Sequence, residues 1–302
     1  MIFISIIPYD FNMTKTQPFI KWAGGKRQLI KELVAGLPQF ESYHEPFLGG
    51  GALFFELNNM HLIKQAHLYD YNEDLITTYR VIKKEPLTLI KELRKSKYKN
   101  DEATFYKIRS ENPKGIVKKA ARLIYLNHTA YNGLYRVNKS GVFNVPFGNY
   151  KNPKFFEADV IYSDSKALQK AELYFGDFSR VLEYAKSRDF VYFDPPYNPL
   201  SKTSGFTSYT SADFGNKDQE RLAHTVKSLD KRGCFVMLSN SSTELVKELY
   251  KDYHFRTVYA HRAINCKAKG RGKIAELIIT NWEPRSKQLN LAEQLTANTT
   301  TV

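Results

Sequence analysis

The chain has 302 residues, of which 42% are apolar, and its 20 Tyr and 20 Phe argue against an intrinsically disordered protein. Its formal net charge is +14, and residues 80–155 hold 18 Lys and Arg against 5 Asp and Glu, which is nearly all of the excess. The two cysteines, Cys234 and Cys266, show neither disulfide nor zinc-ligand spacing, so we expect no metal site.

The N-terminal segment begins with an apolar run that is too short to span a bilayer and lacks the features of a signal peptide. Residues 1–12 are interpreted as an extension, with Met13 as a candidate functional start. No other segment of the sequence looks able to span a membrane. We therefore expect a cytoplasmic protein with no membrane partner.

Strands and helices alternate in the first part of the chain. We expect a strand at Tyr43–Leu48, a helix at 52–59, a strand at Ala66–Tyr69 and a helix at Asp74–Lys84. Gly49-Gly50-Gly51 follows the first strand, and Asp70 follows the second.

Residues 85–165 interrupt this alternation and are predicted to form an inserted, mainly helical domain. Helices are expected over 86–98 and 115–127, and residues 131–150 are expected to form a hairpin or an ordered loop. The basic block lies mostly in this insertion, which indicates a surface that faces a polyanion. A solvated helical face is the alternative.

The alternation then resumes up to about residue 285. The expected strands are Ala171–Phe175, Phe190–Phe193, Cys234–Leu238, His254–Tyr259 and Glu276–Asn281, and the expected helices are Ser179–Lys186, Asp213–Lys231 and Thr243–Lys251. This order predicts an α/β fold with a mostly parallel sheet and helices on both faces, built from residues 1–84 and 166–285. Residues 286–302 are polar and are expected to be a flexible tail.

Gly or Asp lies at the end of four expected strands, at Gly49–Gly51, Asp70, Asp177 and Asp194. Ligands of parallel sheets bind at these carboxyl ends. The glycines allow a ligand to approach the backbone closely, and an Asp at the next strand end can accept hydrogen bonds from both ribose hydroxyls. The pair points to a nucleoside-containing cofactor. The alternative for Asp70 is an N-cap of the following helix.

Asp194-Pro195-Pro196-Tyr197 is the most informative motif. Two prolines make a rigid turn without N–H donors, so the turn presents only acceptors, the Asp carboxylate and a Pro carbonyl. Such a site suits a planar amine with two hydrogens to donate, such as adenine N6. Tyr197 offers a ring on which a base can stack, a contact worth about 1–3 kcal/mol. A plain proline-rich loop is the alternative.

Six segments of the chain occur together in one order, namely KWAGGKRQLI, EPFLGGG, YDYN, YNGLYRVN with GVFNVPFGNY, GDF and DPPY. This arrangement resembles the Dam-type (D12 class) family of site-specific DNA adenine-N6 methyltransferases, from about Phe19 to about Trp282. The resemblance implies a Rossmann-like S-adenosylmethionine-dependent methyltransferase domain. It also implies that residues 85–165 form the target-recognition domain.

The resemblance implies a role for each matching residue of the two cofactor-side motifs and the catalytic turn. Asp194, Pro195 and Tyr197 would be catalytic. The residues implied to bind S-adenosylmethionine, and its product S-adenosylhomocysteine, are Trp22, Lys26, Phe47, Gly49, Gly51, Asp70, Asp177, Phe178 and Asp194. Lys26 would pair with the carboxylate of the cofactor's methionine part. For Asp177, capping of the helix near Ser179 is an equal alternative.

The resemblance also implies DNA contacts. Within the insertion these are Tyr131, Asn132, Leu134, Arg136, Asn138 and Pro146. A second basic run with Arg262, Lys267, Lys269 and Arg271 is interpreted, from its charge and its glycines, as a loop that contacts phosphate. Arg136 is our choice for a guanine reader through O6 and N7, with phosphate binding as the alternative. Tyr131 and Tyr135 would fill the gap left by a flipped base or else form hairpin core. The asparagines are alternatively turn formers, and the second basic run a solvated hairpin.

We therefore expect methyl transfer from S-adenosylmethionine to N6 of a flipped-out adenine in double-stranded DNA, with GATC as the expected site. The alternatives are methylation of RNA adenine, of cytosine N4 or of a protein amide, and a catalytically inactive DNA-binding relative. We expect a monomer on DNA, associated with the nucleoid. A cognate restriction endonuclease acting on the same site, without a stable complex, is a candidate partner.

Overall fold

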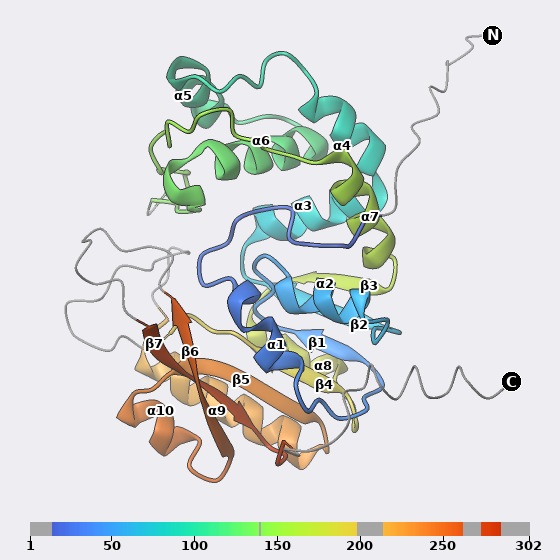
Figure 1. The fold of residues 1–302 in the computed structure, drawn as a ribbon, viewed down its shortest axis with the longest axis vertical. Helices are drawn as coiled ribbons and strands as arrows, with labels where there is room; N and C mark the ends of the chain where they lie inside the picture. The colour runs from blue at the N-terminus through green and yellow to red at the C-terminus, as the bar shows by residue number, and fades with distance from the viewer. Residues whose placement is uncertain (1–13, 139, 198–213, 262–272, 285–302) are drawn as a thin grey trace, which may run out of the picture.

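The computed structural model describes residues 14–138, 140–197, 214–261 and 273–284. Its centre is a seven-stranded sheet with the strand order β3-β2-β1-β4-β5-β7-β6 (Figure 1). The strands are β1 (Tyr43–Glu45), β2 (Ala66–Asp70), β3 (Ala171–Phe175), β4 (Phe190–Phe193), β5 (Phe235–Ser241), β6 (His254–His261) and β7 (Lys273–Thr280). From β3 to β5 neighbouring strands pair in parallel, whereas β7 pairs antiparallel with both β5 and β6. The predicted α/β fold is confirmed.

The predicted strand Tyr43–Leu48 is too long. The observed strand β1 ends at Glu45, because Pro46 has no N–H to continue the ladder and the chain turns toward the glycines. The amide of Leu48 still donates to the carbonyl of Tyr69, at 2.9 Å, so the turn stays attached to β2.

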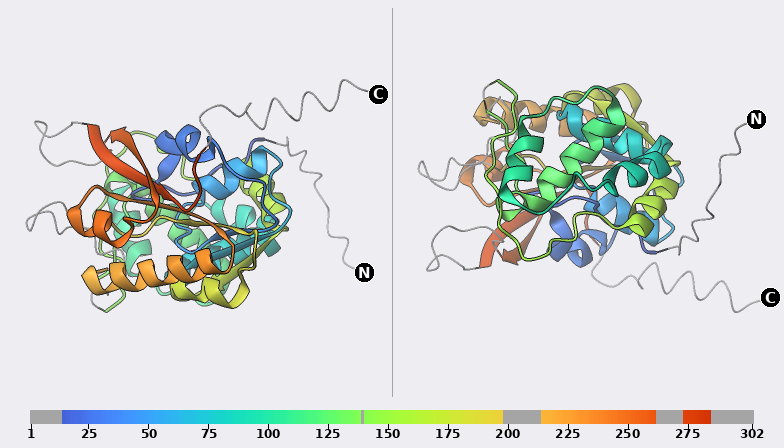
Figure 2. Two further views of the ribbon diagram at one scale, coloured as in Figure 1. Left: turned by 90° about the horizontal axis from the view of Figure 1, so that it is seen from below. Right: turned by 90° about the horizontal axis from the view of Figure 1, so that it is seen from above.

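Helices cover both faces of the sheet, as expected. The helices next to the sheet include α1 (Ile30–Val34), α2 (Ala52–Asn59), α3 (Glu73–Lys84), α8 (Val181–Tyr184), α9 (Asn216–Lys231) and α10 (Glu244–Leu249). Figure 2 shows α1 and α2 on one face and α9 on the other. The predicted helix Ser179–Lys186 is instead a 3₁₀ turn, η3 (Phe178–Arg180), followed by the short α8.

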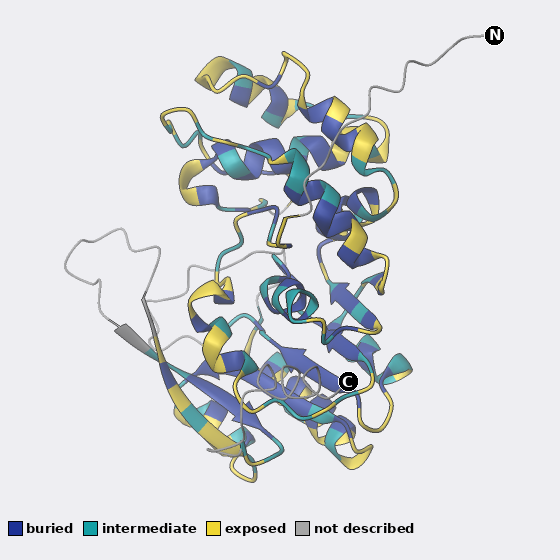
Figure 3. Cartoon of the chain, turned by 45° about the vertical axis from the view of Figure 1, so that its right-hand side comes forward, coloured by how far each residue is buried: buried dark blue, intermediate teal, exposed yellow. Residues whose placement is uncertain are grey.

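The burial of β4 shows why its sequence is apolar throughout. Phe190 and Tyr192 belong to the hydrophobic core on one face, and Val191 and Phe193 belong to the core on the other. Successive side chains of a strand point to opposite faces, so a strand covered on both sides lacks polar positions. Figure 3 shows the buried residues concentrated on the sheet and the inner sides of its helices.

The inserted helices gather at one end of the molecule (Figure 1). They are α4 (Pro86–Leu93), α5 (Glu102–Ser110) and α6 (Ile116–Thr129), and α7 (Ala158–Leu168) leads back to the sheet. Both α6 and α7 pack on α3. The sequence did not predict α5, and the expected domain boundary at residue 165 falls inside α7.

The segment 131–150 is an ordered loop folded back on itself. It begins with the 3₁₀ turn η2 (Tyr131–Gly133), and two isolated antiparallel bridges, Ala130 with Phe147 and Val137 with Phe143, hold its arms together. The Asn138 side chain accepts hydrogen bonds from two amides of the turn that follows it. Of the two predicted forms, the ordered loop is closer than a regular hairpin.

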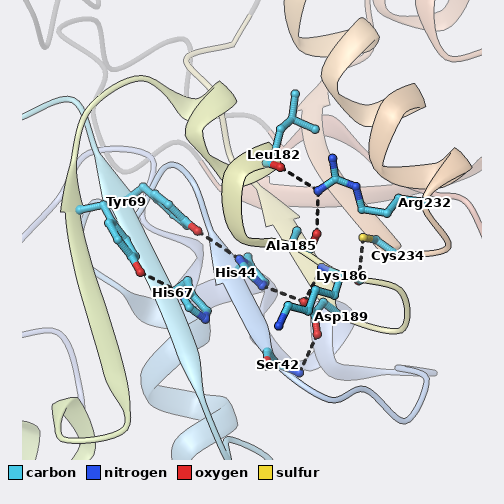
Figure 4. A network of polar contacts seen from close by, with 11 residues as sticks. Ser42, His44, His67, Tyr69, Leu182, Ala185, Lys186, Asp189, Arg232 and Cys234 are labelled. Carbon is cyan, nitrogen blue, oxygen red and sulfur yellow. Dashed lines mark hydrogen bonds and ion pairs between the residues drawn. The ribbon is translucent and has the colours of Figure 1, made fainter.

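A buried polar network joins the amino-terminal halves of the central strands (Figure 4). Asp189, directly before β4, accepts two backbone hydrogen bonds and lies 3.2 Å from His44 Nε2. The His44 ring stacks on that of His67, with centroids 4.6 Å apart. Burial, together with the neighbouring His44, lowers the pKa of His67 to about 4. Because this network lies away from the carboxyl ends of the strands, we assign it to folding.

Within the described ranges, which omit 1–13, 139, 198–213, 262–272 and 285–302, no helix is long and apolar enough to cross a membrane. The same residues contain no group of three or more His, Cys, Asp and Glu side chains that could hold a metal ion.

Candidate active site

The glycines and carboxylates that follow the strands meet at one edge of the sheet. Because β1 to β4 are mutually parallel, Gly49, Asp70, Asp177 and Asp194 all lie at or just beyond carboxyl ends of strands at the same edge. The inserted helices lie beyond the β3 end of the sheet (Figure 1).

The glycine turn after β1 is shaped around Trp22. Gly49 and Gly51 have φ angles of +48° and +66°, in the left-handed region that favours glycine. A Cβ on Gly49 would lie 2.6 Å from Trp22 Cδ1 and 2.9 Å from its Nε1. The hydroxyl of Tyr79, on α3, donates to the carbonyl of Gly49 at 3.0 Å and so fixes the position of the turn. The first position of the turn therefore has room for glycine alone.

Asp70 ties this turn to the end of β2. Its carboxylate accepts from the amide of Gly49 at 2.9 Å and from the amide of Asn72 at 2.9 Å. The N-cap of α3 is Asn72, which accepts from the amide of Leu75 at 3.0 Å, so the interpretation of Asp70 as the cap is wrong. Burial raises the pKa of Asp70 to about 6, although the backbone hydrogen bonds oppose that shift.

An aromatic pair and an ion pair lie beside the turn. The rings of Phe47 and Phe178 stack with centroids 5.4 Å apart. Asp177 caps η3 by accepting from the amide of Ser179, as the alternative interpretation has it, and its two oxygens also accept from Arg221 at 2.7 and 3.0 Å. Burial tends to raise the pKa of Asp177, but the hydrogen bonds from Arg221 and Ser179 outweigh it and lower the pKa.

Lys26 and Asp194 form an ion pair at the centre of the site. Lys26 Nζ lies 2.7 and 2.8 Å from the two carboxylate oxygens and also donates to the carbonyl of Gly24 at 2.8 Å. Only 7% of the Lys26 side chain is exposed. Its Nζ also lies 4.8 Å from the centroid of the Tyr197 ring. The family resemblance implies a cofactor carboxylate as the partner of Lys26, and in this structure the partner is Asp194.

Burial dominates the ionisation of Asp194. It raises the pKa of this carboxyl above its ordinary value, Lys26 opposes the rise, and Glu276 adds to it. Lys26 is therefore the neighbour that favours the ionised form of Asp194.

Three residues from other parts of the fold restrain the turn that begins at Asp194 through hydrogen bonds. Gln219, on α9, donates to the carbonyl of Pro196 at 3.1 Å and accepts from Asn240, on β5, at 3.0 Å. Both amide side chains are fully buried. The hydroxyl of Tyr197 donates to Glu276, on β7, at 2.7 Å.

Comparison with known proteins connects this geometry to a family. Residues 22–264 match the D12 class N6 adenine-specific DNA methyltransferases. The chain belongs to this family. The chain is 44% identical to the Type II methyltransferase M1.LlaDCHI of Lactococcus lactis subsp. cremoris over 280 residues, which are 90% of this chain and 97% of that protein.

Two further relatives span the same region. The Type II methyltransferase M.MjaIII of Methanocaldococcus jannaschii is 44% identical over 288 residues, covering 89% of this chain and all of the relative. The DNA adenine methylase of Escherichia coli K12 is 36% identical over 270 residues, covering 88% and 95%. The predicted family, and with it adenine-N6 methylation of DNA, is confirmed. Family membership favours DNA adenine over RNA adenine, cytosine N4 or a protein amide.

In this D12 methyltransferase the 131–150 loop touches the glycine side of the site. The ring of Tyr135 stacks on Trp22, with centroids 5.4 Å apart and an interplanar angle of 26°. Tyr135 is buried, with 8% of its surface exposed, whereas Tyr131 is 49% exposed. Of the two tyrosines, Tyr131 is therefore the accessible one.

The other loop residues predicted to contact DNA differ in their surroundings. Arg136 is exposed, and its Nε donates to the side chain of Asn144 at 2.8 Å. Asn138 uses its side chain to shape the turn, as the turn-forming alternative has it. The carbonyl of Pro146 accepts from the amide of Tyr131 at 2.9 Å. Asn132 is exposed and Leu134 is partly buried.

The second basic run lies outside the described residues. Arg262, Lys267, Lys269 and Arg271 fall within 262–272, so their predicted phosphate contacts stay predictions.

Four residues that support the site through hydrogen bonds were not predicted from the sequence. These are Gln219, Arg221, Asn240 and Glu276. Asn240 had a usable signal, because the polar run SNSS follows an expected strand like the other strand-end motifs. Gln219 and Arg221 lie on an ordinary polar helix and gave no such signal.

Proposed function

We propose that this D12 methyltransferase moves a methyl group from S-adenosylmethionine to N6 of an adenine flipped out of double-stranded DNA, with GATC as the target. The observation that supports this most is the ion pair of Lys26 and Asp194 beside the Tyr197 ring, at the sheet edge that carries the glycine turn. It combines an acceptor for an amine, a face for a base and a cofactor-type turn in one place.

The residues beside β1 fit a nucleoside cofactor. The close approach of Trp22 to Gly49 and the stacked pair of Phe47 and Phe178 offer flat apolar surfaces, and Asp70 lies at the ribose position of such folds. S-adenosylmethionine, when bound, supplies a methyl group already activated on a sulfonium. No covalent enzyme intermediate is needed, so the protein contributes positioning and electrostatics.

Asp194 and the carbonyl of Pro195 would accept the two hydrogens of adenine N6. Accepting both draws the nitrogen toward tetrahedral geometry and frees its lone pair for attack. Lys26 favours the ionised form of the buried Asp194, which matters because a protonated carboxyl accepts hydrogen bonds less well. The raised pKa of Asp194 then suits it to receive the proton that the methylated nitrogen releases.

The inserted domain would read the DNA. Flipping the base costs a few kcal/mol, which the pocket and a gap-filling side chain offset. Tyr131 is our choice for the gap because it is exposed. Arg136, oriented by Asn144, would donate to O6 and N7 of a guanine. We propose a monomer on DNA, with a restriction endonuclease of the same specificity as a functional partner.

The decisive experiment combines labelled S-adenosylmethionine with defined substrates. Duplexes with GATC, duplexes with scrambled sites, single strands and RNA are incubated with the enzyme, and the modified base is mapped. Label on adenine N6 of GATC duplexes is the expected result. Label on cytosine or only on RNA would refute the proposal.

The Asp194→Ala variant tests the mechanism. It should lose methylation while keeping DNA binding, because the base's main acceptor is removed and the inserted domain is untouched. Asp252→Ala, an exposed change at the opposite edge of the sheet, is the matched control. A methylation rate close to that of the wild type in Asp194→Ala would refute the mechanism.

A further inference from the structure

We propose that Glu276 is a positioning residue, which holds the Tyr197 ring in place for the target base by accepting its hydroxyl hydrogen bond. The inference deepens the proposed function and rests on it, because the base-stacking role of Tyr197 is part of that proposal.

The hydrogen bond between Tyr197 and Glu276 is short, and it restrains the end of the ring that is farthest from the backbone. The hydroxyl of Tyr197 donates to Glu276 Oε2 at 2.7 Å, a length typical of a hydrogen bond to a carboxylate. A tyrosine ring turns about two side-chain bonds near the backbone. Holding the hydroxyl, at the far end of the ring, therefore fixes both the tilt and the position of the face on which a base would stack.

Glu276 is a rigid anchor. It lies within β7, an interior strand of the sheet, where it is paired with Ser241 on β5 and Val258 on β6. The next residues along the strand, Leu277 and Ile278, are buried in the core. The bond thus connects the turn after β4 to a strand that is not its neighbour in the sheet.

This bond completes the restraint of the turn. Lys26 holds the carboxylate of Asp194, Gln219 holds the carbonyl of Pro196, and Glu276 holds the hydroxyl of Tyr197. Each restraint comes from a different part of the fold. Without the last one, the hydroxyl end of the ring would lose this restraint.

The charge of Glu276 also argues for a function. Glu276 contributes to the raised pKa of Asp194 and of Tyr197, which means that its carboxylate opposes ionisation nearby. A second carboxylate beside a buried one is unfavourable for folding. The presence of Glu276 beside Asp194 is therefore better explained by the hydrogen-bond acceptor that it provides than by a contribution to folding stability.

A double-mutant cycle tests the inference in steady-state methylation. Glu276→Ala and Tyr197→Phe each remove the bond, and each should lower kcat by about 10- to 100-fold with little change in KM for DNA. The double variant should be no slower than the slower single variant, because both changes act through one bond. Glu276→Gln keeps an oxygen acceptor and should recover most of kcat.

Two further measurements complete the design. A duplex with 2-aminopurine at the target position should show weaker stacking in Glu276→Ala than in the wild type, read as a change in fluorescence. Glu244→Gln, whose side chain is 90% exposed and pairs with Lys247, is the control for a Glu-to-Gln change. Melting temperature and S-adenosylmethionine affinity check that the fold and the cofactor side are intact.

Two results would overturn the inference. One is a Glu276→Ala loss that is as large in the Tyr197→Phe background as in the wild type, and the other is a Glu276→Gln variant as slow as Glu276→Ala. Either would mean that Glu276 acts through its charge or another contact. A wild-type enzyme that methylates none of the substrates would instead refute the proposed function.

Discussion

Gly49→Ala is the most direct test of the cofactor side of the site. The added Cβ would lie 2.6 Å from Trp22 Cδ1, and ordinary contact begins at 3.4 Å, so the indole has to move away. Tyr135 stacks on Trp22 and resists such a movement. The φ angle of +48° adds backbone strain of about 1–2 kcal/mol for any residue with a Cβ.

The expected cost follows from these two terms. Overpacking costs about 1–3 kcal/mol, so together with the strain the free energy of unfolding should fall by about 2–5 kcal/mol in all. A displaced Trp22 should also weaken S-adenosylmethionine binding by at least tenfold, or about 1.4 kcal/mol. Denaturant unfolding and titration calorimetry measure the two effects.

Gly141→Ala is the matched control. Gly141 has a φ angle of +75°, but a Cβ there would meet no atom of the described residues within 4 Å. This variant should show the backbone strain without the loss of cofactor affinity. Equal affinity for S-adenosylmethionine in Gly49→Ala and Gly141→Ala would refute the placement of Trp22 in the cofactor site.

Two other changes probe the loop contact and the buried network. Tyr135→Ala should weaken cofactor binding by about 3- to 10-fold, because a stacked aromatic pair contributes about 0.5–1.5 kcal/mol. Tyr135→Phe keeps the ring and should bind the cofactor as the wild type does. Equal losses of affinity in the two variants would contradict the role of stacking. His67→Asn should remove a pH dependence of stability. The pKa of His67 is lowered to about 4 in the folded protein, so as the pH falls below 6.5 the unfolded wild type binds a proton before the folded one does. The free energy of unfolding of the wild type should therefore fall by about 1–3 kcal/mol relative to that of the variant by pH 4. Denaturant unfolding at several pH values measures that difference, and a difference that stays constant with pH would exclude His67 as its source.

The sheet was largely predictable because its residues obey local rules. Strands such as Phe190–Phe193 are short and apolar throughout, and polar or glycine residues end them, so β3 and β4 have the predicted bounds. The exceptions have local causes as well. Pro46 shortens β1, and α5 was missed because its sequence, EATFYKIRS, mixes polar and apolar residues with little contrast.

The site was predictable only where a motif lies within one segment of the chain. The glycine turn, Asp70 and Asp194 follow strands directly, so the parallel order of those strands brings them together. Glu276 lies 79 residues from Tyr197, and Asn240 lies 21 residues from Gln219. Such pairs depend on how strands and helices pack across the sheet, and no local pattern carries that information.

Lys26 shows why even a correctly chosen residue needs the structure. From sequence, its ammonium was expected to pair with the cofactor's carboxylate, and the structure pairs it with Asp194 at 2.7 Å instead. The two partners need not conflict. Lys26 offsets the charge of the buried Asp194, and it holds the two carboxylate oxygens that we propose as acceptors for adenine N6. A second carboxylate arriving with the cofactor would give Lys26 another partner and free those acceptors, so cofactor binding would prepare the site for the base.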